Sequence, residues 1–330
     1  MSTFLQPAYI ETIINDVTQR DYSTPILDMF FKRKKSAPDG FVRVPKEVSD
    51  YQDILPLIER GSAITPSSIG GTKQWTTYEL RTFGDLKVLK PYEIEKLKNQ
   101  LAGLTGVTYA QKKVELVNDI IGEFNRKVDL TREYMAGSAL TGTIKDKDGN
   151  TIETFDIPAD NKLGTQNVSG GGVKIWELIR AMIKQMHKST KYRGNVGFII
   201  GENAYDKILA SDEYQKWTAN PANALTAEEI VRGVEGYMLN RKYPFLVADA
   251  KYYNNGTTGS FFNEDSLIIA PIGLFTEFYA PIATNKGVFS KIKHIDTFEM
   301  YNPDGTAYRL QSSAMPIVTL PNAIVSAVIS

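Results

Sequence analysis

The stretch of sequence that decides the fold is Tyr109–Thr141, YAQKKVELVNDIIGEFNRKVDLTREYMAGSALT. Apolar side chains recur in it at alternating steps of three and four residues, as at Val114, Val117 and Ile121, until Arg132 interrupts the stripe. This spacing predicts a single amphipathic helix. At 1.5 Å per residue the helix would be about 50 Å long, which exceeds the diameter of a small domain. We therefore expect it to run along a flat or elongated body.

The residues after the helix carry clear turn signals. Gly142 stands where a C-cap glycine is expected. Asp148-Gly149 then predicts a β-hairpin over Thr143–Pro158. The alternative to an extended helix is a bundle helix with a kink at Gly122 or Gly137.

Composition excludes several classes of protein. The 330 residues are 42% hydrophobic and 23% charged, as in an ordinary globular protein, and Lys+Arg and Asp+Glu are 38 each, so the net charge is zero. A dedicated nucleic-acid binder usually has a basic surplus. The chain has no cysteine and two histidines, which excludes thiol chemistry, disulfides and a multi-histidine metal centre within one chain. We find no signal peptide and no apolar run of about 18 residues, so we expect no membrane span and a reducing, cytoplasm-like compartment.

The N-terminal part is predicted to be a docking arm. Phe4–Val17 has weak helical periodicity, and Thr24–Phe31 is a short apolar anchor. A run of four cations follows: Lys32, Arg33, Lys34 and Lys35. The run is interpreted either as a contact with nucleic acid or an acidic partner, or as a solvated turn.

A long, thin hairpin is predicted between Glu59 and Pro91. Gly70 and Gly71 form its expected tip, because glycine takes positive φ at little cost. Trp75 and Tyr78 lie on its return strand. Two strands alone cannot cover such side chains, so we expect these aromatic residues to contact a neighbouring subunit. The alternative is that both pack on the chain's own body.

The second half predicts an α/β unit. Ile175–Met186 has helical periodicity, Val196–Ile200 is a strand, and a second helix follows Gly201. A strand–glycine–helix turn can bind phosphate, but one isolated glycine favours an ordinary turn. Asn302–Gly305, between Thr297–Tyr301 and Ala307–Gln311, predicts a β-hairpin. The chain closes with two apolar strands, Pro316–Leu320 and Ala323–Ile329.

Signals for catalysis are weak. The familiar serine-hydrolase and zinc-hydrolase motifs are absent, and His187 and His294 stand in unremarkable contexts. The paired carboxylates Glu93/Glu95 and Glu228/Glu229 leave open a soluble enzyme as the least favoured alternative. Asp146–Ile157 does not fit a calcium loop, because its glycine and its twelfth residue are wrong. We predict no catalytic, cofactor or metal site.

Several weak motifs, in a fixed order along the chain, resemble one family. They are Pro25–Phe31, Ile69–Thr72, Ala139–Gly142 before a hairpin, Gly197–Ile200, Asn255–Asp265 with Asn263 where the family usually has proline, and Gln311–Pro316 before the last strands. In this order they resemble the phage major capsid protein E family, the lambda-type branch of the Hong Kong 97-type capsid fold.

This resemblance implies an α+β fold of four parts. They are an N-terminal arm (1–58), an extended β-hairpin loop (59–91), a peripheral domain with a long spine helix and β-sheet (92–165 and 294–315), and an axial α/β domain (166–293 and 316–330).

The resemblance also implies a function and partners. The chain is expected to be a major capsid protein that self-assembles into the hexamers and pentamers of an icosahedral shell around double-stranded DNA, built in the host cytoplasm. A separate scaffolding protein, a portal and a decoration protein are the other implied partners. An encapsulin-like compartment shell is the alternative. The expected contacts between subunits are Gly70, Gly71, Trp75, Tyr78, Phe30 and Phe31, and the expected DNA-facing run is Lys32, Arg33, Lys34 and Lys35.

Overall fold

The computed structural model describes residues 24–45, 75–92, 95–96, 109–168, 172–190, 192–212, 215–216, 235–238, 243–248, 251–254, 257–284, 287–301 and 304–330. Its helices are α2 (Pro25–Phe30), α4 (Tyr109–Leu140), α5 (Ile175–Thr190) and α6 (Glu202–Ala210), with short 3₁₀ turns η1 (Ala159–Asn161) and η2 (Pro321–Ala323). None of the helices in these ranges is long and apolar enough to cross a membrane.

The strands fall into sheets and hairpins that we describe in turn. They are β1 (Arg33–Ser36), β2 (Phe41–Pro45), β3 (Trp75–Glu79), β4 (Phe83–Leu89), β5 (Thr143–Lys145), β6 (Thr151–Thr154), β7 (Lys162–Gln166), β8 (Val196–Gly201), β9 (Glu235–Met238), β10 (Tyr243–Ala248), β11 (Lys251–Asn254), β12 (Thr257–Ser260), β13 (Ser266–Pro271), β14 (Thr276–Tyr279), β15 (Ile282–Thr284), β16 (Gly287–Phe289), β17 (Lys293–Tyr301), β18 (Asp304–Ser312), β19 (Ala314–Ile317) and β20 (Val325–Ile329).

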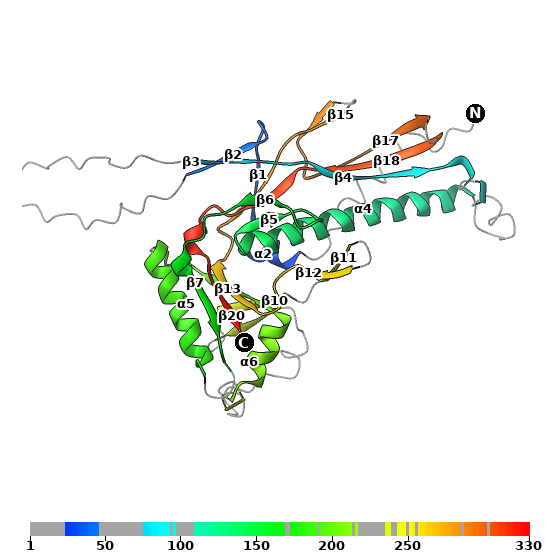
Figure 1. The fold of residues 1–330 in the computed structure, drawn as a ribbon. Helices are drawn as coiled ribbons and strands as arrows, with labels where there is room; N and C mark the ends of the chain where they lie inside the picture. Colours follow the sequence, from blue (N-terminus) through cyan, green and yellow to red (C-terminus); the bar gives the residue numbers. More distant parts are fainter. Residues whose placement is uncertain are drawn as a thin grey trace, which may run out of the picture.

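The predicted long helix is confirmed as α4, which is unbroken over 32 residues. It runs along a β-sheet rather than in a helical bundle, so the bundle alternative is wrong (Figure 1). Gly142 follows it with φ +101°, as expected of a C-cap glycine. Gly137 has a packing role, because a Cβ there would lie 2.7 Å from the carbonyl oxygen of Phe261. The glycine lets a loop from far along the chain approach the helix closely.

The N-terminal two thirds of α4 support an antiparallel sheet in the order β17-β18-β4 (Figure 1). The hairpin of β17 and β18 confirms the turn that the sequence predicts near Gly305, and the two strands pair over nine residues. The apolar stripe of α4, including Val117, Ile121 and Phe124, packs on Tyr308 and other residues of the sheet's inner face. The helix periodicity therefore describes one buried face that this sheet covers.

A second layer contains a mixed six-stranded sheet in the order β7-β20-β13-β8-β10-β9. The predicted helix–strand–helix unit is confirmed as α5, β8 and α6, and both helices pack beside the sheet (Figure 1). Every residue of β8 is buried, as the continuous apolar run Val196–Ile200 indicates. Met182, Phe198 and Leu267 are among the fully buried residues of this core.

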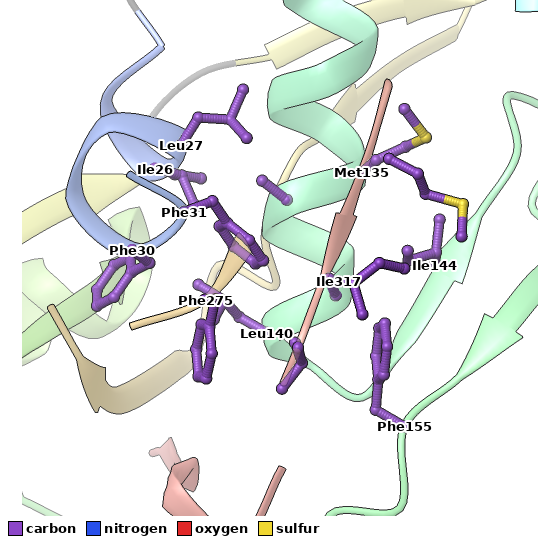
Figure 2. Packing of buried hydrophobic residues seen from close by; sticks show 14 of the residues in the cluster. Ile26, Leu27, Phe30, Phe31, Met135, Leu140, Ile144, Phe155, Phe275 and Ile317 are labelled. Carbon is purple, nitrogen blue, oxygen red and sulfur yellow. The ribbon is translucent and has the colours of Figure 1, made fainter. Parts of the chain in front are cut away.

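A central core joins the two layers around the C-terminal end of α4. It contains α2, the three-stranded sheet β1-β14-β19, the antiparallel ribbon of β2 and β3, and the hairpin of β5 and β6. Figure 2 shows Phe31 and Phe275 on the side of the helix nearer α2, Ile144 and Phe155 on the opposite side, and Ile317 on the strand that crosses the helix between them. The rings of Phe31 and Phe275 are 5.4 Å apart. The last two strands of the chain, both predicted, belong to different sheets, β19 to this one and β20 to the six-stranded one.

The pairing of the predicted hairpin over Glu59–Pro91 is wrong in detail. Its return strand exists as β3, but β3 pairs with β2, so that Trp75 lies opposite Pro45. The following strand, β4, pairs with β18 in the sheet above α4. The ribbon therefore starts at Phe41, inside the range that the sequence assigned to the arm. The expected tip at Gly70 lies outside the described residues.

We predict that Phe31 stabilises the subunit itself. Phe31→Ala should lower the free energy of unfolding by about 3–5 kcal/mol, because it removes a fully buried ring from the central core. Urea denaturation followed by tryptophan fluorescence measures this change. Phe41→Ala is the matched control, since this ring is 54% exposed and its loss should cost less than about 1 kcal/mol. An unchanged stability for Phe31→Ala would contradict the core assignment.

Candidate functional site

One turn of α4 carries a buried network of charged side chains. Arg132 donates to Glu277 of β14 through Nε and Nη2, at 2.6 and 2.7 Å, and to Asp129 Oδ1 through Nη1, at 2.7 Å. Lys293 of β17 binds the second carboxylate oxygen of Asp129 at 2.8 Å. All four side chains are less than a tenth exposed. The network therefore ties α4 to two different sheets.

The charges in this network depend on one another. Burial alone would lower the pKa of Arg132, but its hydrogen bond to Glu277 and the two nearby carboxylates raise it above its usual value. Two cations and two carboxylates are present, so the network is neutral overall. Removing one partner of such a group leaves an uncompensated buried charge, which typically costs about 3–5 kcal/mol. Arg132, which interrupts the apolar stripe, thus joins α4 to β14.

Glu133, the next residue, holds the arm helix α2. Its carboxylate accepts the backbone N–H of Ile26 at 2.6 Å and that of Leu27 at 3.2 Å. Thr24, at the N-cap position, makes no side-chain cap hydrogen bond. A carboxylate from another helix therefore satisfies N–H groups that a local cap normally satisfies. Burial, helped by Asp28, raises the pKa of Glu133 to about 7, although the two backbone hydrogen bonds act in the opposite direction.

The ribbon of β2 and β3 has one buried and one exposed face. Val42, Val44 and Tyr78 point to the core. Trp75, opposite Pro45, and Phe41, opposite Glu79, lie on the other face and are 55% and 54% exposed. The two aromatic rings lie at opposite ends of this face, and each leaves apolar area in water. We call this the ribbon face.

A second exposed face with apolar side chains belongs to the sheet above α4. On the side away from the helix, Leu86 is 47% and Phe298 37% exposed. Arg309 lies with its guanidinium carbon 5.2 Å from the Phe298 ring centre and is held by two hydrogen bonds to Asp296. We call this the outer sheet face. Among the described residues, five of the eight exposed large hydrophobic side chains lie on strands β2, β3, β4, β16 and β17.

The basic run forms a strand and not a turn. Lys32 is followed by β1, which pairs in parallel with β14 and exposes the side chains of all its four residues. Successive side chains of a strand point to opposite faces, so Arg33 and Lys35 share one face and Lys34 lies on the other. Within the described part of the chain, none of these cations has an ion pair. The solvated-turn alternative is therefore wrong about the backbone but right about the exposure.

Three of the predicted contacts between subunits are corrected by their burial. Phe30 and Phe31 are fully buried in the chain's own core, where α2 packs on α4. Tyr78 is 5% exposed, its ring lies 5.3 Å from that of Phe155, and burial, with Asp156 and Glu153 nearby, raises its pKa to about 12. Side chains that are covered within one subunit cannot anchor a second.

Of the predicted surface residues, Trp75 is exposed, whereas Gly70 and Gly71 lie outside the described residues. Sequence reasoning missed Phe41, Leu86 and Phe298. A signal for Phe41 existed, because in Phe41–Pro45 the inward positions are already taken by Val42 and Val44, which forces the phenylalanine outward.

The other motifs that lie in the described ranges have structural contacts that account for them. In the described ranges no group of three or more His, Asp or Glu residues could hold a metal ion. At the turn before α6 the carbonyl oxygen of Glu264 accepts the N–H of Ala204, and Glu202 lies in the first turn, which disfavours a phosphate. His187 lies in the last turn of α5, and burial with Arg193 nearby lowers its pKa. His294 stacks on Phe289 at 4.2 Å.

The buried charged residues around α4 hold elements of the fold together. The buried carboxylates of the α4 network are bound to cations or backbone N–H groups, so they are not placed to activate a substrate. In the described part of the chain, the exposed surfaces that remain to be explained include the ribbon face, the outer sheet face and the basic strand β1. Such surfaces fit contacts with other macromolecules rather than a pocket for a small molecule.

Comparison with known proteins gives one family match and several structural ones. Residues 10–329 match the family described as phage major capsid protein E. No curated protein matches the chain by sequence.

Three solved structures share the fold of the chain. A protein described as the capsid protein of an Escherichia coli CFT073 prophage is 13% identical with TM-score 0.64, and 99% of each chain is covered. The capsid of the native GTA particle is 12% identical with TM-score 0.54 (94% and 92% covered). The encapsulin of the holo-SrpI complex from Synechococcus elongatus PCC 7942 is 12% identical with TM-score 0.51 (99% and 91% covered). The mixed α+β architecture with its long helix is thus that of the capsid and encapsulin structures.

We predict that Glu133 makes the stability of the subunit depend on pH. Its pKa is raised from 4.5 to about 7, so the folded chain binds this proton more tightly than the unfolded chain does. The contribution of Glu133 is therefore fully present below about pH 4.5 and is lost as the pH rises through 7. Relative to Glu133→Gln, the wild type should lose on the order of 3 kcal/mol over this range in urea denaturation. Glu177→Gln, at an exposed site, is the control, and parallel pH curves for wild type and Glu133→Gln would refute the assignment.

Proposed function

The chain belongs to the phage major capsid protein E family, and on that premise we propose that copies of it assemble through the ribbon face and the outer sheet face into the shell of a phage head. The observation that carries the function is the family match over nearly the whole chain, residues 10–329. The protein is accordingly a structural component of the virion capsid and forms an icosahedral shell. It is not an enzyme.

We assign the contacts between subunits to the exposed faces. The support is physical: Trp75 and Phe41 leave large apolar areas in water in the isolated subunit, and burial of such area is the main gain of association. Tyr78 and Leu80 anchor the ribbon in the central core, so its exposed face cannot turn inward. A fixed projecting face that meets a different face on the next copy gives head-to-tail contacts, and these close into rings such as hexamers and pentamers.

The division of the chain into functional parts is also a proposal. The axial domain would comprise the six-stranded sheet with α5 and α6, and the peripheral domain α4 with β4, β17 and β18. The arm would comprise α2 and β1, and the extended loop would include the ribbon of β2 and β3. Compared with the boundaries expected from the sequence, this moves Phe41–Pro45 from the arm to the loop, Phe83–Leu89 from the loop to the peripheral domain, and residues 162–165 from the peripheral to the axial domain.

Double-stranded DNA inside the shell is the proposed partner of the basic strand. Four consecutive exposed cations without ion pairs in the described residues suit non-specific contact with phosphates. A net charge of zero is compatible with this role, since a shell wall needs only limited contact with its contents. A scaffolding protein, a portal and a decoration protein remain proposed partners from the family resemblance.

A compartment shell of the encapsulin type is the rival with the same fold. The likeness to an encapsulin at 12% identity concerns the fold alone, whereas the family match favours the phage head. The contents of purified particles separate the two, because a phage head holds double-stranded DNA and a compartment holds cargo protein. The soluble-enzyme alternative is based on the pairs Glu93/Glu95 and Glu228/Glu229, of which Glu93, Glu228 and Glu229 lie outside the described residues. The family match favours a structural protein over this alternative.

We predict that Trp75→Ala impairs assembly and spares the subunit. The wild type should form rings, tubes or shells in negative-stain electron microscopy and sedimentation velocity. The variant should assemble at least tenfold less, because an aromatic anchor at the centre of an interface contributes about 2 kcal/mol or more. Its unfolding midpoint in urea should stay nearly unchanged, since the side chain is exposed.

Tyr92→Ala is the matched control for Trp75→Ala, because Tyr92 is an exposed aromatic residue outside the ribbon. Normal assembly of Trp75→Ala would remove the ribbon face from the interface. A wild-type chain that remains a folded monomer at all concentrations would contradict the proposed function itself.

We predict that the basic strand stabilises DNA-filled particles and has no effect on empty shells. Replacing Lys32, Arg33, Lys34 and Lys35 by Gln should leave the subunit's unfolding unchanged, because exposed charges contribute little to stability. DNA-filled particles should lose thermal stability, and this loss should shrink at high salt, while empty shells stay the same. Gln at Lys145, Lys162, Lys184 and Lys188 is the control with the same change of charge. Equal effects on filled and empty particles would assign the run to protein contacts.

A further inference from the structure

The outward face of α5 is strongly basic. Residues 172–201 include one acid, Glu177, and six cations: Lys174, Arg180, Lys184, Lys188, Lys191 and Arg193. Arg180, Lys184 and Lys188 follow one another at four-residue steps and are exposed, so they form one row along the helix. The row lies opposite Met182 and Met186, which α5 buries in the core of the six-stranded sheet. We call the three cations of this row the α5 face.

The charge of the α5 face is not neutralised within the described part of the subunit. No ion pair there involves its three cations, whereas Lys174 and Glu177 pair with each other at 3.5 Å. Arg193 donates to two backbone carbonyl oxygens, so it adds a positive charge near the end of the helix. Asp160 and Lys162, at the turn η1 that packs on α5, are both exposed and cancel each other.

The chain balances this charge elsewhere. Residues 172–201 carry a net charge of +5 and the whole chain carries none, so the remaining residues together carry −5. A molecule that is neutral overall but has its charges separated is complementary to a second copy of itself. An exposed acidic face on a second copy therefore suits the α5 face.

Such an acidic face lies on α6. Glu202 and Asp206 are four residues apart on the side of α6 away from the core, and we call these two residues the α6 face. Glu202 binds Lys251 at 2.9 Å, and Lys207 binds Asp265 at 2.9 Å, so these two pairs are neutral. The other charged residues described in α6, in the turn after it and in the loop that contacts it are three acids and one cation: Asp206, Asp212, Glu264 and Lys216. The surroundings of the α6 face thus have a net charge of −2.

The two faces lie apart in one subunit. Both helices pack on the six-stranded sheet, α5 beside η2 and β20 and α6 beside β8 and β10. Figure 1 shows the two helices well separated, with β7 and β20 between them. Among the described residues no ion pair joins α5 to α6. The faces of one copy therefore do not neutralise each other.

From these observations we propose that the α5 face binds the α6 face of a second copy of this chain in the assembled particle. This inference rests on the proposed function, because it takes another copy of the chain as the partner. The contact is ionic and adds to the contacts of the ribbon face and the outer sheet face. Opposite charges that meet across an interface fix its register and exclude wrong orientations more than they raise its affinity. The two faces therefore select which sides of two copies meet.

An exchange of charges tests this contact. Lys184→Glu or Asp206→Lys alone should lower assembly at least tenfold in sedimentation velocity, because each variant brings like charges together. The double variant Lys184→Glu/Asp206→Lys should assemble like the wild type, since it only exchanges the two charges. Lys145→Glu, at an exposed site on another hairpin, is the control, and all variants should keep the unfolding midpoint in urea. Normal assembly of both single variants, or no recovery in the double variant, would overturn the inference and leave the proposed function standing.

Cross-linking gives a second test that leaves the charges in place. The chain has no cysteine, so Ala181→Cys beside the α5 face and Ala210→Cys beside the α6 face introduce the only thiols. Assembled particles of the double variant should form covalent dimers with a short bis-maleimide reagent, and neither single variant should do so. Particles that form without this cross-link would overturn the contact. A loss in Lys184→Glu that is confined to DNA-filled particles would also overturn it, because DNA would then be the partner of the α5 face.

Discussion

The buried ion network on α4 is the constraint on which the rest of the structure depends. Arg132 joins the helix to β14, Asp129 joins it to β17 through Lys293, and Glu133 joins it to α2. Within two turns of one helix, the arm, the central sheet and the outer sheet are therefore held in one geometry. Apolar packing alone specifies such positions loosely, whereas a bidentate pair between Arg132 and Glu277 requires a defined distance and orientation. The network contributes positioning more than it contributes net stability.

Much of this fold is predictable from the sequence, and the parts that are not have a common cause. The period of α4, the glycine at its end and the hairpins at Asp148-Gly149 and near Gly305 are local signals, and the structure confirms them. The partner of β3 was missed because the pairing of two strands some 30 residues apart leaves no local mark. Tyr78 was assigned to the wrong surface for the same reason, since its cover, Phe155, comes from a hairpin beyond the long helix.

The prediction of surface residues has the same limit, because exposure also depends on distant parts of the chain. Exposure of Trp75 could be expected from a thin ribbon, but the parity that sends Val42 inward and Phe41 outward depends on which face the core covers. The opposite error concerns Phe30 and Phe31 at the end of α2. An apolar anchor suggests contact with another molecule, but its docking site is in the same chain, a hundred residues away. Glu133 supplies that docking site through the backbone N–H groups of Ile26 and Leu27. A single charged residue on the polar edge of a helix gives no sign of such a role.

The position of the ion network along α4 has a mechanical consequence. From Asp129 back to Tyr109 the helix extends about 30 Å, and it carries the outer sheet along this length. Because the network fixes this length against both sheets, a change of about 10° in the angle at which a whole subunit meets its neighbour would move the far end by about 5 Å. The fixed network therefore converts a small change of contact angle into a large displacement at the end of helix and sheet, with the cores intact.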